Sequence, residues 1–125
     1  MRICVTSEGG SLDSNVDPRF GRCQYFIIAD ADTLEFEAVE NPNIESMGGA
    51  GIQSAQLVAS KQVKAVVTGN VGPNAFQTLQ AAGIEVFPGA SGIVKEAIEK
   101  YRKGKLNVAH SPSVGSHSGM PGKNK

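Results

Sequence analysis

The fold of this chain is decided by the stretch KAVVTGNVGP, residues 64–73. Its first half is a short, nearly all-apolar run, which is typical of a buried parallel strand. A glycine-rich turn follows, and Pro73 suits the first position of a helix because the N–H it lacks would be unpaired there anyway. Residues 84–101 repeat the pattern with a second strand, turn and helical stretch. Two successive strand–loop–helix units predict an α/β fold.

The residues before this stretch predict three more strands and one more helix. Strands are expected at residues 2–6, 24–30 and 34–40, and the third alternates apolar with acidic residues, as an edge strand does. Apolar residues at helical spacing predict a helix that follows the glycine-rich residues 48–51 and ends near Lys61. The order is therefore βββαβαβα. An antiparallel meander followed by right-handed crossovers gives a mixed five-stranded sheet with three helices.

Length and composition indicate one small domain. The chain has 125 residues with 40% hydrophobic residues, so we expect one domain over residues 1–104 and a flexible polar tail over residues 105–125. Lys+Arg and Asp+Glu are equal at 12 each, so no net field favours nucleic acid or an acidic membrane. The chain opens directly on a strand and has no apolar run near the roughly 18 residues of a membrane helix, so a cytoplasmic location is expected.

Residues 7–23 form a long polar loop that ends in VDPRFGRC, residues 16–23. Loops of this length in a small domain are usually functional or disordered. The ending puts Arg19, Arg22 and Cys23 beside one another. The topology places this loop and the starts of all three helices at the carboxyl edge of the sheet, where open α/β sheets bind ligands.

Glycine-rich helix starts at that edge favour an anionic ligand. Helix starts offer unpaired backbone N–H groups and the positive end of a dipole, and we expect such donors near Gly49, Gly72 and Gly89. Arg19 and Arg22 would contact the periphery of the same anion. Neither nucleotide-binding glycine motif is present, so the glycines could also serve as turns alone.

The two cysteines are too few for a disulfide framework. Cys23 lies at the mouth of the second strand, where arginines and helix starts should lower the pKa of its thiol and favour a thiolate metal ligand. A cysteine in such a place is also often merely packed. Cys4 lies inside a central strand and is predicted to be a small buried hydrophobe.

Two further groups of residues could bind metal. The long loop carries three carboxylates that could hold a divalent ion for phosphoryl transfer or nuclease chemistry, or could simply be solvated: Glu8, Asp13 and Asp17. The tail carries three residues that could hold copper or iron weakly or could be solvent-exposed: His110, His117 and Met120. No Ser-His-Asp set and no C-x-x-C motif is visible, so the sequence shows no machinery for nucleophilic or redox catalysis, and a non-enzyme is expected.

Four segments together resemble the dinitrogenase iron-molybdenum cofactor-binding family, whose members are NifX-like proteins. They are ICVTS at 3–7, VDPRFGRC at 16–23 with Tyr25-Phe26 following, GGAG at 48–51 and TGNVGPNA at 68–75. The resemblance covers about residues 1–104. It implies a ribonuclease-H-like three-layer fold with strand order 3-2-1-4-5.

The resemblance also implies a function and a site. It implies non-catalytic binding or carriage of an iron-sulfur or iron-molybdenum cofactor or its precursor, with cluster-assembly proteins as possible partners. Nitrogenase-associated members commonly carry a histidine where Arg19 stands, and Cys23 could replace it as the soft metal donor. The alternatives are a regulatory domain that binds a small anion or partner protein, and a metal-dependent phosphoryl-transfer or nuclease enzyme that uses Glu8 and Asp17.

Overall fold

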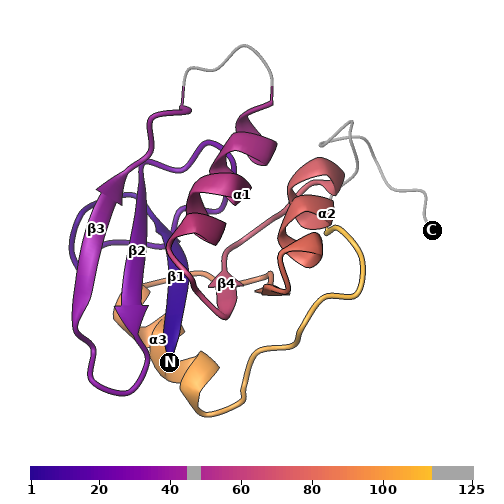
Figure 1. Cartoon of the computed structure of the whole chain (residues 1–125). Helices are drawn as coiled ribbons and strands as arrows, with labels where there is room; N and C mark the ends of the chain where they lie inside the picture. Colours follow the sequence, from indigo (N-terminus) through magenta and orange to yellow (C-terminus); the bar gives the residue numbers. More distant parts are fainter. Residues whose placement is uncertain (45–48, 114–125) are drawn as a thin grey trace.

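The structure of the chain is a computed structural model that describes residues 1–44 and 49–113. It contains five strands and three helices in the predicted order (Figure 1). The strands are β1 (Arg2–Ser7), β2 (Tyr25–Asp30), β3 (Phe36–Glu40), β4 (Ala65–Val67) and β5 (Glu85–Phe87). The helices are α1 (Ala50–Ser60), α2 (Pro73–Ala81) and α3 (Val94–Arg102). None of the helices in the described part of the chain is long and apolar enough to cross a membrane.

The strands form one mixed sheet in the order β3-β2-β1-β4-β5. The first three strands pair antiparallel, whereas β1–β4 and β4–β5 pair parallel, as helical crossovers require. The predicted mixed sheet, its 3-2-1-4-5 order and its three helices are confirmed. The name ribonuclease-H-like stays a prediction.

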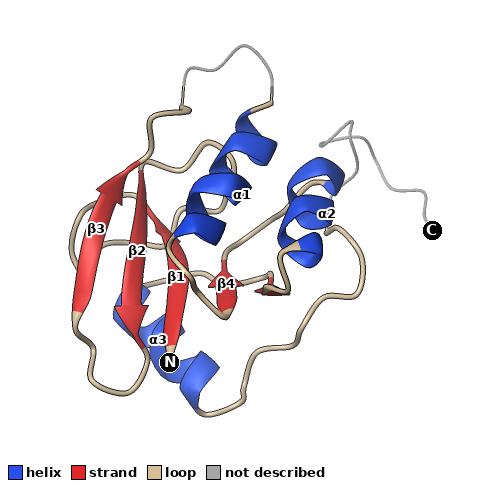
Figure 2. Ribbon diagram, in the orientation of Figure 1, coloured by secondary structure: helices blue, strands red, loops and turns tan. Residues whose placement is uncertain are grey.

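Helices cover both faces of the sheet, with α1 and α2 on one side and α3 on the other (Figure 2). The alternation along β1 explains how: Cys4 faces the α1 and α2 layer, whereas Ile3 and Val5 face α3. Both layers are apolar and fully covered, so β1 is buried from Ile3 onward. The molecule therefore has three layers and two hydrophobic cores.

The chain beyond α3 runs back across the molecule. The backbone N–H of Ala109 donates to the carbonyl of Val86 (2.8 Å). Ser113 then pairs with Val71, its N–H donating to the Val71 carbonyl (3.0 Å) and its Oγ accepting from the Val71 N–H (2.8 Å). The predicted tail is thus hydrogen-bonded to the domain at two points, to β5 through Ala109 and to the turn before α2 through Ser113. His110 is exposed, and the other two candidate tail ligands, His117 and Met120, lie outside the described residues.

Candidate functional site

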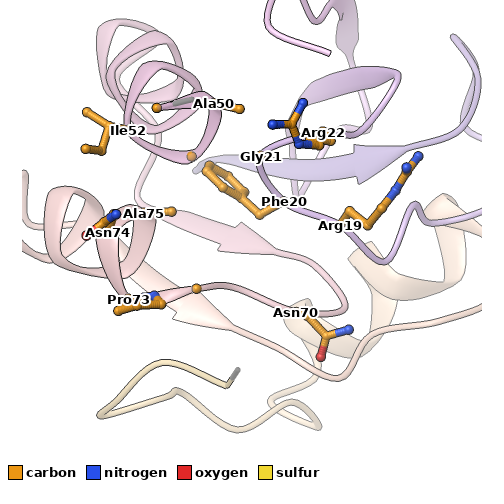
Figure 3. Close-up of a pocket in the computed structure, with 13 residues that line it drawn as sticks. Arg19, Phe20, Gly21, Arg22, Ala50, Ile52, Asn70, Pro73, Asn74 and Ala75 are labelled. Carbon is orange, nitrogen blue, oxygen red and sulfur yellow. The ribbon is translucent and has the colours of Figure 1, made fainter. Parts of the chain in front are cut away.

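A hollow of about 500 Å³ lies at the carboxyl edge of the sheet. Its walls are residues 19–22 of the long loop, residues 49–52 at the start of α1, Asn70, and residues 72–75 at the start of α2. Figure 3 shows the two arginines on one side of this hollow and the two helix starts on the other. Four of the predicted site residues are brought together here: Arg19, Arg22, Gly49 and Gly72.

The starts of α1 and α2 are open. In α1 the first N–H that bonds back to a carbonyl is that of Gln53, which donates to Gly49 (2.9 Å), and in α2 it is that of Phe76, which donates to Gly72 (2.9 Å). No side chain caps either start within the described residues. Within the described residues, the N–H groups of residues 50–52, 74 and 75 have no acceptor and are therefore available to a ligand, while Pro73 has no N–H.

Three small residues hold these walls in close contact. A Cβ atom on Gly21 would lie 3.0 Å from the Cα and N atoms of Gly51. A Cβ atom on Gly51 would in turn lie 3.2 Å from the Cβ of Ala75. We call Gly21, Gly51 and Ala75 the small-residue seam. The seam brings the long loop, α1 and α2 as near to one another as their backbones allow.

The loop that carries the arginines is fastened to the turn after β4. The Asn70 N–H donates to the Pro18 carbonyl (2.7 Å), and the Phe20 N–H donates to the Asn70 carbonyl (3.3 Å). Gly69 permits this approach, because a Cβ there would lie 2.6 Å from the Pro18 Cα. The buried ring of Phe20 packs near Phe26, with ring centroids 6.0 Å apart. The loop is thus anchored in the core between its two exposed arginines.

Two polar side chains fix the turn at Gly21. The Gly21 carbonyl accepts hydrogen bonds from Asn41 Nδ2 (3.1 Å) and Ser54 Oγ (3.0 Å). Both residues are buried, so these hydrogen bonds satisfy polar groups that are shielded from solvent. Sequence reasoning missed Asn41 and Ser54, because nothing near them in the chain indicates a partner so distant.

Both arginines are exposed and held by oxygen acceptors. Arg19 donates from Nε to Asp17 Oδ1 (3.2 Å) and from Nη2 to Asp17 Oδ2 (3.3 Å). The hydrogen bond to Asp17 raises the pKa of Arg19 above its already high value, so the guanidinium stays charged. Arg22 donates from Nη1 to the Ile44 carbonyl (2.7 Å). Both arginine residues therefore line the hollow opposite the helix starts, and the Arg22 side chain lies nearer the start of α1 than that of Arg19 (Figure 3).

The start of α3 is closed and lies outside the hollow. Its N–H groups donate to the long loop, Val94 to the Ser14 carbonyl (2.9 Å) and Lys95 to the Leu12 carbonyl (2.9 Å). The predicted donor Gly89 gives its N–H to the Gly69 carbonyl (2.8 Å) and does not line the hollow. The structure thus brings two helix starts to the site and not three.

Cys23 lies beneath the site and not in it. Its side chain is fully buried among residues of the α1 and α2 core, and it does not line the hollow. Burial raises the pKa of the Cys23 thiol, and the Asp17 charge raises it further, so the expectation of a lowered pKa was wrong. Cys4 is a fully buried thiol in the central strand, as predicted.

The loop carboxylates do not assemble a metal site. Glu8 and Asp13 are exposed, whereas Asp17 is buried and faces Arg19. Within the described residues, no three His, Cys, Asp or Glu side chains lie together in a way that could hold a metal ion. The predicted divalent-metal alternative therefore finds no ligand set in this part of the chain.

Residues 1–104 match the dinitrogenase iron-molybdenum cofactor family, and the chain belongs to that family. The chain is similar to the orange protein of Desulfovibrio gigas, solved in its apo form: identity is 44%, the TM-score is 0.86, and the match covers 89% of this chain and 94% of that one.

Two more relatives cover most of the domain. A proposed NifB protein from Thermotoga is 41% identical with a TM-score of 0.75, and the match covers 86% of this chain and 91% of that one. An uncharacterized protein from Methanocaldococcus jannaschii is 34% identical over 99 aligned residues, and the match covers 76% of this chain and 84% of that protein.

Proposed function

We propose that this protein binds and carries an anionic metal-sulfur cluster, of the iron-sulfur or iron-molybdenum type or a precursor of one, and that it catalyses no reaction. The observation that carries the proposal is the hollow itself, in which two open helix starts face two arginines. The family relationship supports the choice of a cofactor as cargo. The orange protein, described in its apo form, supports a site that can be empty or filled.

The chemistry of the lining fits the outside of such a cluster. The described walls offer guanidinium groups, asparagine amides and backbone N–H groups, and they contain no thiol, imidazole, thioether or carboxylate. These groups donate hydrogen bonds to sulfide or oxygen atoms, and none of them is a soft or imidazole ligand of the kind that holds iron. We therefore assign Arg19, Arg22 and the N–H groups at the two open helix starts to the cargo, and leave Cys23 and Gly89 outside the site.

The apolar part of the lining strengthens this binding. The hollow has about 500 Å³ of space, within the range of roughly 300–1,000 Å³ usual for small-ligand sites. Phe20, Ile52 and Pro73 line it between the donors. Apolar walls exclude water and lower the local dielectric constant, so each charged hydrogen bond to the cargo gains strength.

The test is reconstitution under anaerobic conditions with iron and sulfide, followed by visible absorbance and elemental analysis. Arg19→Ala/Arg22→Ala should weaken cluster binding at least about 10-fold, because hydrogen bonds to charged groups contribute about 1.5–3 kcal/mol each. Arg102→Ala, on the far side of the sheet, is the matched control and should bind normally. An unchanged spectrum in Cys23→Ser is expected as well. Normal binding by the double variant would contradict the proposal.

A regulatory domain for a small anion is the second candidate, because hydrogen-bond donors without metal ligands also suit a simple oxyanion. Thermal stabilisation by phosphate, citrate or molybdate, with no response to iron and sulfide, would favour it over a cluster carrier.

A further inference from the structure

We propose that Asp17 is the positioning residue of the site: its buried carboxylate holds the Arg19 guanidinium where the cargo is contacted. This inference rests on the proposed function, since it concerns the same hollow. Asp17 itself does not line the hollow and acts through Arg19.

The carboxylate of Asp17 is buried, with 1% of the side chain exposed, and it accepts four hydrogen bonds. Oδ1 accepts from the Arg19 N–H (3.1 Å) and from Arg19 Nε (3.2 Å). Oδ2 accepts from Arg19 Nη2 (3.3 Å) and from the Gln24 N–H (3.3 Å). The carboxylate therefore binds the guanidinium in a bidentate manner, which fixes the plane of the guanidinium as well as its position.

The carboxylate can hold the arginine still because its own backbone is clamped to β1. The Asp17 N–H donates to the Thr6 carbonyl (2.9 Å), and Thr6 Oγ1 donates to the Asp17 carbonyl (2.7 Å). The Thr6 hydroxyl also lies 2.8 Å from the Thr68 hydroxyl of the neighbouring segment. Asp17 is thus part of the sheet's framework, although it belongs to a loop by sequence.

Arg19 needs such support. Its side chain is 58% exposed, and a long exposed arginine samples many rotamers unless a partner holds it. Asp17 takes two of the five N–H donors of the guanidinium, and the other three have no partner among the described residues. The pairing therefore leaves N–H donors for an anion. It also restricts the rotamers of the Arg19 side chain in advance, which lowers the entropy cost of binding.

Two other roles for Asp17 predict different results. If Asp17 acted only through its negative charge, its removal would strengthen the binding of an anion. If it only shaped the loop backbone, its removal would weaken binding whether or not Arg19 is present. If Asp17 positions Arg19, removal of Asp17 should weaken binding when Arg19 is present and should have no effect when Arg19 has been replaced by alanine.

The experiment is a double-mutant cycle with Asp17→Asn and Arg19→Ala. Binding of molybdate is measured by calorimetry, and cluster uptake by reconstitution with iron and sulfide. Asp17→Asn should weaken binding about 5- to 10-fold in the wild-type background and cause no further loss in Arg19→Ala. Asp13→Asn, an exposed carboxylate of the same loop with the same charge change, is the control and should not weaken binding. Unchanged or tighter binding by Asp17→Asn, or an equal loss without Arg19, would overturn the proposal.

Two more measurements keep the proposal testable if Asp17→Asn does not fold or if the wild type binds neither probe. Arg19→Lys keeps the charge but loses the two-point contact, so it should bind as weakly as Arg19→Ala even if Asp17→Asn does not fold; wild-type affinity would overturn the proposal. In the free protein, the Arg19 Nε–H should give a slowly exchanging NMR signal that Asp17→Asn abolishes. If the wild type binds neither probe, the proposed function fails, while this signal still decides whether Asp17 holds Arg19.

Discussion

The starts of α2 and α3 follow the same strand–loop–helix pattern, yet one is open and the other closed. At α2 residues 74 and 75 line the hollow, and their N–H groups have no acceptor within the part of the chain that the structure describes. At α3 the N–H groups of Val94 and Lys95 are bonded to carbonyls of the long loop. The difference teaches that a helix start becomes a ligand site only when no other part of the chain has already taken its donors.

One loop produces both outcomes. Its residues 12–16 bond to the start of α3, whereas its residues 19–22 border the open starts of α1 and α2. Between them, Pro18 lies against Gly69 and pairs with Asn70. This contact separates the part of the loop that bonds to the start of α3 from the part that lines the hollow at the starts of α1 and α2.

The largest effect is expected where the loop is fastened, in Gly69→Ala. The new Cβ would lie 2.6 Å from the Pro18 Cα, a backbone atom that can move only if the loop moves. We expect the free energy of unfolding to fall by about 1–3 kcal/mol, measured by urea denaturation, and cluster binding to be lost.

Gly72→Ala is the matched control for stability. Its Cβ would meet nothing within 4 Å, and its φ of −84° suits alanine. It should keep the free energy of unfolding within about 0.5 kcal/mol of the wild type. A Gly69→Ala protein as stable as Gly72→Ala would mean that the loop is not held at Gly69.

Hydrogen exchange compares the two kinds of helix start directly. In the free protein, the amides of Val94 and Lys95 should exchange about 10- to 100-fold more slowly than those of Asn74 and Ala75, because only the first pair has acceptors among the described residues. NMR measures all four rates in one sample. Addition of iron and sulfide should slow the second pair alone. Equal rates in the free protein would remove the distinction between open and closed starts.

A carboxylate placed at each start should separate stability from binding. Asn74→Asp puts a negative charge at an open, exposed start, which should stabilise α2 by about 0.3–1 kcal/mol and weaken anion binding about 10-fold. Ser91→Asp makes the same charge change before α3, outside the hollow, and should leave binding unchanged. Thermal unfolding and molybdate titration measure both effects. Similar loss of binding in the two variants would show that the charge acts at long range.

The smallest effect concerns the thiols beneath the hollow. Burial raises the pKa of Cys4 and of Cys23 above the value of 9.0 for a free thiol, so the folded protein keeps both protonated where the unfolded chain begins to ionise. This stabilisation is full well below pH 9, has fallen by about 0.4 kcal/mol per thiol at pH 9, and is lost progressively as the pH rises further. The free energy of unfolding should fall more steeply with pH in the wild type than in Cys4→Ala/Cys23→Ala. Parallel profiles would mean that water reaches these thiols.

The sequence predicted most of the fold because the relevant patterns are local. Apolar runs and helical spacing marked every strand and helix, and the acidic alternation of residues 34–40 marked the strand that lies at the sheet edge. Parallel pairing of β1, β4 and β5 then places helix starts at one edge without further information. Arg19, Arg22, Gly49 and Gly72 meet at the hollow for this reason.

The rest of the site depends on contacts between distant segments. The donors of α3 are taken by carbonyls of Leu12 and Ser14, which no pattern near α3 announces. Whether Cys23 faces inward depends on how Phe20 seats the loop in the core. Asp17 had a usable local signal, because Asp-Pro followed by a polar residue favours a turn in which the carboxylate bonds to the N–H two residues on.

The small-residue seam gives the hollow a property beyond its donors. Gly21, Gly51 and Ala75 already bring the long loop, α1 and α2 into contact, so these walls cannot move closer together around a smaller ligand. A hollow with fixed walls selects ligands by size and shape. A ligand that does not span the distance between the arginines and the helix starts makes only about half of the hydrogen bonds. Binding then orders little of the protein, and calorimetry should record a favourable enthalpy with only a small entropic penalty.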